Sequence, residues 1–141
     1  MEARLILYPL LAMVLLTFIV AFTMLGRRVG ALKSKRIHPQ KIATSAQMAA
    51  LIEDTRASDN FRNLFETPVL FYVAMLTIHS TGLICAPHLV LAWAYVAARC
   101  VHSYIQCTGN IVMRRFYAFI ASCFFLLGIW SMLAYQLFPV A

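Results

Sequence analysis

The feature that most constrains this chain is an apolar run near its N-terminus. Residues 5–25 form a run of 21 residues without a formal charge. A helix needs about 20 apolar residues to cross the hydrocarbon core of a bilayer. A signal peptide would have a shorter apolar region and a small-residue cleavage site, whereas Gly26-Arg27-Arg28 follows here like a stop-transfer flank. We therefore predict a retained transmembrane helix.

Three further apolar segments follow the first one, at residues 64–86, 89–107 and 116–140. Each has close to the length that a membrane-spanning helix requires. We expect Pro87 to end the second span, and a short basic turn at 108–115 to separate the third span from the fourth. The chain is therefore predicted to cross the membrane four times.

Composition supports a membrane protein made of one domain. Hydrophobic residues make up 62% of the 141 residues and charged residues only 12%, whereas soluble domains carry about 25% charged residues. No part of the chain is polar and long enough to form a separate soluble domain. We expect one all-α domain over residues 1–141, folded as an integral membrane four-helix bundle.

The basic residues lie between the apolar segments and predict the orientation. The connection at 26–63 holds eight basic and three acidic residues, and two more arginines lie in the turn at 108–115. With four spans both connections fall on one side, which the positive-inside rule places in the cytoplasm. Both termini would then be non-cytoplasmic. Because topology accounts for the net charge of +7, we predict the bilayer as a partner and not nucleic acid.

Within the long connection, the pattern becomes helical again from about Pro39. We expect a helix there that could run without interruption into the second span. The four cysteines, in contrast, predict neither disulfides nor a metal site, because they lie in or beside apolar stretches without CxxC spacing. We expect Cys85, Cys100, Cys107 and Cys123 to be small buried apolar side chains.

Ionisable residues inside the predicted spans are candidates for a functional site, because a membrane tolerates them poorly. They are Glu66, Arg99 and His102. At 100° per residue, one face of the third helix carries Arg99, His102, Gln106 and Asn110. Asp59, Asn63 and Glu66 likewise share a face of the preceding helix. We predict that the two polar faces meet each other or a neighbouring subunit, not lipid.

The roles of these residues remain open from the sequence pattern alone. Glu66 could hold helices together by pairing with Arg99 or Arg62, or it could contact a ligand. Arg114 and Arg115 could be topology signals or ligand-binding residues.

An aromatic cluster follows this arginine pair at the start of the fourth span. We expect its side chains to face lipid or the core. They are Phe116, Tyr117, Phe119, Phe124 and Phe125.

Two motifs resemble those of a known family. The segment Arg62-Asn63-Leu64-Phe65-Glu66-Thr67-Pro68 resembles the helix-2 signature of the membrane-associated proteins in eicosanoid and glutathione metabolism, the MAPEG family. Arg99-Cys100-Val101-His102 resembles the Arg-x-x-His of helix 3 in that family. Length, four spans and a long first cytoplasmic connection agree, so the resemblance covers nearly the whole chain.

The resemblance implies a homotrimer that binds glutathione as a co-substrate between subunits at the cytosolic end. The matching glutathione-binding residues would be Asn63, Glu66, Arg99 and His102, to which we add Arg62. Arg115, with Arg114 as the alternative, would match the arginine that stabilises the glutathione thiolate. Many enzymatic members have Arg where this chain has Asp59, so the pattern is closer to bacterial members. We accordingly expect a bacterial inner membrane location.

The first functional expectation is a glutathione-dependent transferase or peroxidase that acts on lipophilic electrophiles arriving from the membrane. The second is a lipid-binding protein without enzymatic activity. A small four-span exporter, in which a membrane-embedded Glu66 couples to protons, ranks third because Glu66 lies at a helix end.

Overall fold

The computed structural model describes residues 2–138, which form helices and no strands. The elements are η1 (Ala3–Ile6), α1 (Leu7–Ser34), η2 (Pro39–Ile42), α2 (Ser45–Leu51), α3 (Arg56–Asn63), α4 (Thr67–Thr81), α5 (Ala86–Cys107) and α6 (Val112–Leu137). The prediction of an all-α fold is therefore confirmed for the described residues.

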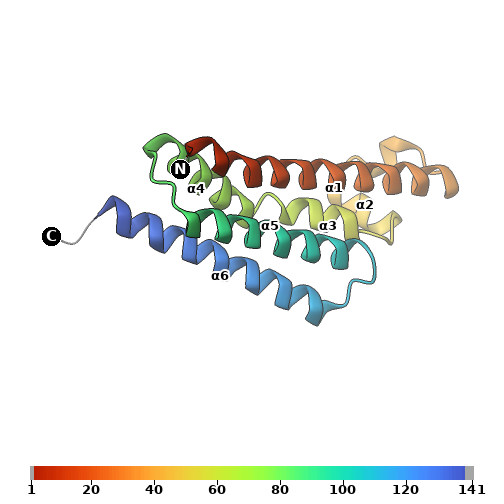
Figure 1. Ribbon diagram of the computed structural model, residues 1–141. Coiled ribbons are helices and arrows are strands. Elements are labelled where there is room, and N and C mark those ends of the chain that lie inside the picture. Colours follow the sequence, from red (N-terminus) through yellow and green to blue (C-terminus); the bar gives the residue numbers. More distant parts are fainter. Residues whose placement is uncertain (1, 139–141) are drawn as a thin grey trace.

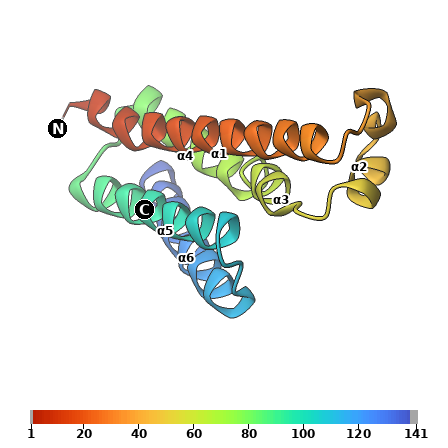
Figure 2. The same ribbon diagram turned by 90° about the vertical axis from the view of Figure 1, so that its right-hand side faces the viewer.

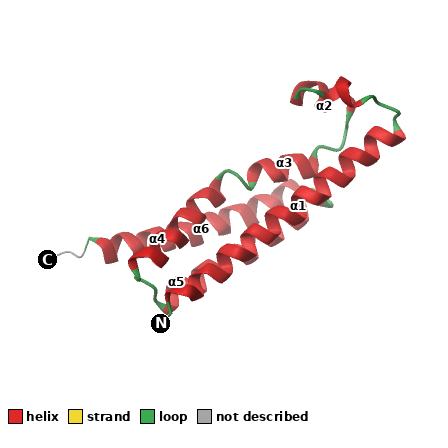
Figure 3. Ribbon diagram, turned by 90° about the horizontal axis from the view of Figure 1, so that it is seen from above, coloured by secondary structure: helices red, strands yellow, loops and turns green. Residues whose placement is uncertain are grey.

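The long helices lie roughly side by side along one direction (Figure 1). α1 contacts α3, α4 and α5, while α6 packs against α5 and α4. Figure 2 shows α1 with α3 and α4 on one side and the α5–α6 pair on the other. The end of α6 lies at the same end of the molecule as η1, and α2 lies at the opposite end (Figure 3).

The apolar core runs between α1, α4, α5 and α6. Its centre includes a stacked pair, Phe71 of α4 and Tyr95 of α5, with ring centroids 4.4 Å apart. The other buried core residues of these four helices are Met13, Leu16, Val20, Ala74, Met75, Ile78, Ala92, Val96, Leu126, Ile129 and Leu133. Many large apolar side chains on the outer faces remain exposed, as expected for helices that contact lipid.

Two helical segments of the described chain are long and apolar enough to cross a membrane, Ala3–Ser34 and Val112–Leu137. The first continues through Arg27 and Arg28, which the sequence pattern placed beyond its end. α1 continues to Ser34, so the N-terminal helix reaches well past the apolar run that predicts it.

The helical stretch from Pro39 does not run unbroken into the second span, which corrects our expectation. It is divided into η2, α2 and α3, and a further break at residues 64–66 separates α3 from α4. Pro68 explains that last break, because proline lacks an N–H and its ring clashes with the carbonyl four residues earlier. α4 then ends at Thr81, and Gly82 follows with a φ of 69°, the left-handed conformation that glycine adopts at helix C-termini.

Two further boundaries differ from those expected. Pro87 does not end the second span but lies in the first turn of α5, where a missing N–H costs nothing. Arg114 and Arg115 are not part of the turn, because α6 already begins at Val112. The turn is therefore only residues 108–111, and it includes Asn110, which we had placed on the polar face of the third helix.

Candidate functional site

A chain of hydrogen bonds links a buried arginine of α5 to an exposed carboxylate at the break after α3. Arg99 is fully buried. Its Nη2 donates to Oδ1 of Asn63 at 2.5 Å and to the carbonyl of Asn63 at 3.3 Å. Nδ2 of Asn63 donates in turn to Oε2 of Glu66 at 2.9 Å. Asn63 thus connects two charges that form no direct ion pair among the described residues.

The break explains why Asn63 and Glu66 lie together. α3 ends at Asn63, and the backbone N–H of Glu66 donates to the Asn63 carbonyl in a tight turn at 3.3 Å. Glu66 then caps α4 with φ −96° and ψ −104°. Without Pro68 the chain could continue as one α-helix, and the Asn63 carbonyl that Arg99 contacts would then accept the helical hydrogen bond from the N–H of residue 67.

The two polar faces predicted from helical periodicity meet, as expected. Besides the Arg99–Asn63 contact, Oγ of Ser103 donates to Oδ1 of Asn60 at 3.3 Å, and both residues are buried. His102 and Gln106 are 3% and 6% exposed. Polar side chains therefore bind α3 to α5 at the end of the molecule where both helices approach the 108–111 turn.

An open pocket of about 270 Å³ lies between α3, α5 and α6 at this end. Its lining residues are Asp59, Asn63, Glu66, His102, Gln106, Val112, Arg115, Phe116 and Phe119. Nδ1 of His102 and Oε1 of Gln106 are buried and have no hydrogen-bond partner among residues 2–138. Since buried polar atoms normally have a partner, a bound molecule is one source of the partners that these two lack.

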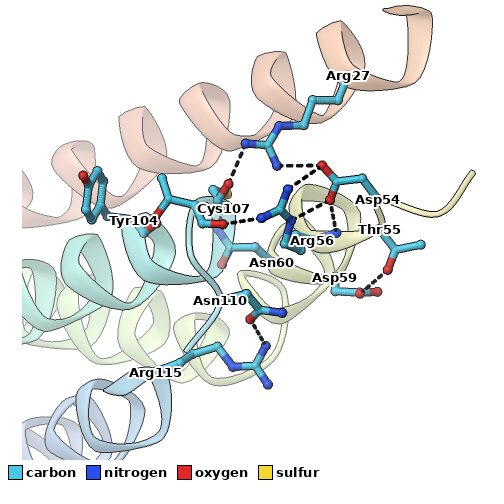
Figure 4. A network of polar contacts seen from close by, with 11 residues as sticks. Arg27, Asp54, Thr55, Arg56, Asp59, Asn60, Tyr104, Cys107, Asn110 and Arg115 are labelled. Carbon is cyan, nitrogen blue, oxygen red and sulfur yellow. Dashed lines mark hydrogen bonds and ion pairs between the residues drawn. The ribbon is translucent and has the colours of Figure 1, made fainter. Parts of the chain in front are cut away.

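One wall of the pocket comes from the start of α6 and combines a cation with aromatic rings. Nη1 of Arg115 donates to Oδ1 of Asn110 at 2.8 Å (Figure 4). The ring centroid of Phe119 lies 6.0 Å from the ring centroid of His102. The same centroid lies 5.9 Å from Cζ of Arg99. This wall can therefore contact both an anionic and an apolar group of a bound molecule.

The structure brings together four of the seven predicted site residues, Asn63, Glu66, His102 and Arg115. Arg99 lies behind the pocket and touches it through Asn63. Arg62 and Arg114 are exposed and lie outside the lining, so a ligand contact for them stays a prediction.

Sequence reasoning missed part of the lining. Asp59 and Gln106 shared helix faces with the predicted residues, and this periodicity was the signal that could have included them in the site. Phe116 and Phe119 were expected to face lipid or the core, whereas they line the pocket. The cysteines also need a correction, because Cys100 is exposed and the other three are half-buried.

The charges in the pocket are mixed. Two carboxylates, of Asp59 and Glu66, and one guanidinium, of Arg115, line it, while the guanidinium of Arg99 lies buried behind Asn63. Such a site suits a ligand that carries both an ammonium group and anionic groups. It is less basic than a pocket that recognises anions alone.

Comparison with known proteins gives one match. The sequence model of the MAPEG family matches residues 6–135. A search of curated proteins found no significant match, and a search of solved structures found none either. Because the family match spans most of the chain and two helices can cross a membrane, the protein is a membrane protein that belongs to the MAPEG family.

Proposed function

We propose that the protein is a glutathione-dependent membrane transferase or peroxidase that acts on lipophilic electrophiles. The observation that carries this proposal is the pocket of α3, α5 and α6, in which a guanidinium, two carboxylates and unpartnered buried polar atoms lie beside an aromatic wall. Membership of the MAPEG family supports it.

The residues present fit glutathione, which carries an ammonium group, two carboxylates and a thiol. Glu66 and Asp59 are suited to the ammonium group, and Nδ1 of His102 can exchange a hydrogen bond with a peptide group. Arg115 keeps guanidinium N–H groups beyond the one bonded to Asn110, so it can hold an anion. The volume of about 270 Å³ is below the range of about 300–1,000 Å³ found for small-molecule sites, so part of the ligand would extend beyond this pocket.

The reaction needs a thiolate, because the thiolate and not the thiol is the nucleophile. A guanidinium beside the sulfur favours the charged form, and the proton leaves to water through the open mouth. The sulfur then forms a bond to an electrophilic carbon, and the leaving group departs with the bonding electrons or the adduct takes up a proton. In this scheme Arg115 is the catalytic residue.

The assembly and orientation are part of the same proposal. We propose four membrane-spanning segments, formed by α1, by α3 with α4, by α5 and by α6, in a homotrimer whose neighbouring copy completes the incomplete pocket. The basic connections would face the cytoplasm of a bacterial cell, with the protein in the inner membrane. The pocket lies at the end of the molecule that carries the 108–111 turn, so glutathione would enter from the cytoplasm.

Two neighbouring arginines provide a matched test. Purified protein is titrated with glutathione, and thiolate absorbance in the ultraviolet is followed. Arg115→Ala should abolish the thiolate signal, whereas Arg114→Ala, which removes an equal charge one residue away and outside the pocket, should retain most of it. No thiolate in the unmodified protein, together with no conjugation across a panel of electrophiles, would refute the proposal.

A second candidate function, lipid binding without catalysis, is favoured by a separate apolar groove of about 380 Å³ on α1, α4 and Phe65 of the break before α4. Its lining residues are Leu10, Val14, Thr17, Phe18, Phe65, Tyr72 and Leu76. Mass spectrometry of lipid that co-purifies with the protein distinguishes the two functions. Under lipid binding, Val14→Trp should displace the lipid, and no variant should affect a thiolate signal because none would exist.

A further inference from the structure

A cluster of charges outside the pocket holds the C-terminal end of α5. Arg27 of α1 and Arg56 of α3 both bind Asp54, at 3.4 Å for Arg27 Nη1 and at 2.8 and 3.0 Å for Arg56 Nε and Nη2 (Figure 4). Each guanidinium also donates to a backbone carbonyl, Arg27 to Cys107 at 2.5 Å and Arg56 to Thr108. We call these three side chains the Asp54 clamp.

The clamp supplies hydrogen-bond donors to backbone carbonyls at the C-terminal end of α5. The last carbonyls of a helix lack partners within the helix and carry partial negative charge. Two arginines from other helices supply N–H groups there, and Asp54 offsets the repulsion between their positive charges. The hydrogen bond from Arg56 holds the pKa of Asp54 below its ordinary value, so the carboxylate stays ionised at neutral pH.

The clamp contacts the 108–111 turn through Thr108, and the same turn carries Asn110, which binds Arg115. The backbone N–H of Asn110 donates to the carbonyl of Ile105 at 2.8 Å, and Asn110 has a φ of 47°, in the left-handed region that few residues other than glycine adopt. Its Oδ1 is the acceptor for Arg115. A shift of the Thr108 carbonyl would therefore move Asn110, and with it the guanidinium in the pocket.

We propose that Asp54 is a positioning residue of the pocket. Among residues 2–138 it forms no hydrogen bond or ion pair with a lining residue of the pocket, but it fixes Arg27 and Arg56 against α5 and so fixes the turn that holds Arg115. The part of this inference that concerns thiolate rests on the proposed function. The part that concerns the turn does not, because it follows from the contacts of the clamp.

The chain offers a matched control in the adjacent residue. Glu53 is also acidic and also forms an ion pair, with Lys35 at 2.9 Å. Within the described part of the chain, Lys35 otherwise donates to the carbonyl of Leu51 and forms no hydrogen bond with α5. Glu53→Gln therefore removes an equal charge and an ion pair without touching the clamp. Asp54→Asn removes the clamp charge, and Asp54→Glu restores it.

The first measurement needs no ligand. Amide hydrogen exchange of residues 108–111 is followed by mass spectrometry in the full-length protein. We expect exchange to become about tenfold faster in Asp54→Asn, the change that a loss of roughly 1.4 kcal/mol of local stability produces. Glu53→Gln and Asp54→Glu should stay close to the unmodified protein. Equal exchange in Asp54→Asn and Glu53→Gln would overturn the inference whether or not glutathione binds.

The second measurement tests the link to the pocket. With glutathione bound, the pH at which thiolate absorbance appears should rise by about half a unit or more in Asp54→Asn, because Arg115 is less well placed. A lowered melting temperature with an unchanged pH profile would show a purely structural role and overturn the proposal. Absence of thiolate in the unmodified protein would refute the proposed function instead, and hydrogen exchange would still decide whether the clamp holds the turn.

Discussion

The contact between Arg99 and Asn63 allows a quantitative prediction. Asn63→Ala removes the side-chain acceptor of a fully buried guanidinium and leaves only the backbone carbonyl at 3.3 Å. A hydrogen bond to a charged group contributes about 1.5–3 kcal/mol, and the lost bond to the exposed Glu66 adds a few tenths. We expect Asn63→Ala to lower the free energy of unfolding by about 2–3 kcal/mol.

A double-mutant cycle isolates that contact. Arg99→Met replaces the guanidinium by an unbranched apolar side chain. When a buried charge and its polar partner are both replaced by apolar groups, the free energy of unfolding often changes little. In that background Asn63→Ala should cost only about 0.5 kcal/mol, which gives a coupling energy near 2 kcal/mol. Unfolding of all four proteins is measured in mixed detergent micelles. A coupling energy below about 0.5 kcal/mol would refute the conclusion that Asn63 is the main partner of Arg99.

Three further predictions concern the pocket, the backbone and pH. Asp59→Asn should weaken glutathione binding about two- to fivefold by calorimetry, because the exposed carboxylate of Asp59 is suited to the ligand's ammonium group, and tighter binding would show instead that Asp59 repels the ligand's carboxylates. Gly82→Ala should lower the free energy of unfolding by about 1 kcal/mol because the φ of Gly82 is 69°. Gly26→Ala, inside α1 where an added Cβ would meet no neighbouring atom within 4 Å, should instead raise it by up to about 1 kcal/mol. The pKa of Asp54 is lowered from its ordinary value of 3.8, so the contribution of Asp54 to the free energy of unfolding should be complete above pH 3.8. This contribution should disappear as the pH falls through the lowered pKa. A difference in stability between the unmodified protein and Asp54→Asn that persists at the lowest pH would contradict this.

Local sequence signals predicted much of the helical structure. The apolar runs identified α1, α4, α5 and α6, because segments of that length and polarity have few alternatives to a helix in a membrane. Boundaries were harder to predict. Pro68 and Pro87 both begin helices, and whether a proline ends one helix or begins the next depends on where the flanking carbonyls find partners, which is a property of the folded chain.

The candidate site was predictable only in part for a similar reason. Periodicity placed Asn63 with Glu66 and Arg99 with His102, because residues three or four apart share a helix face. It could not predict that Asn63 would bridge Arg99 and Glu66, since that depends on the break after α3. The Asp54 clamp could not be predicted either, because its arginines bind backbone carbonyls that carry no sequence signal.

We propose that the pocket between α3, α5 and α6 binds glutathione as its thiolate. An experimental structure of the protein with glutathione tests it most directly. We predict that the sulfur lies within hydrogen-bond distance of the Arg115 guanidinium, with the ammonium group near Glu66 and a peptide group near His102. A glutathione molecule bound elsewhere, or a pocket that stays free of it at saturating concentration, would contradict the account.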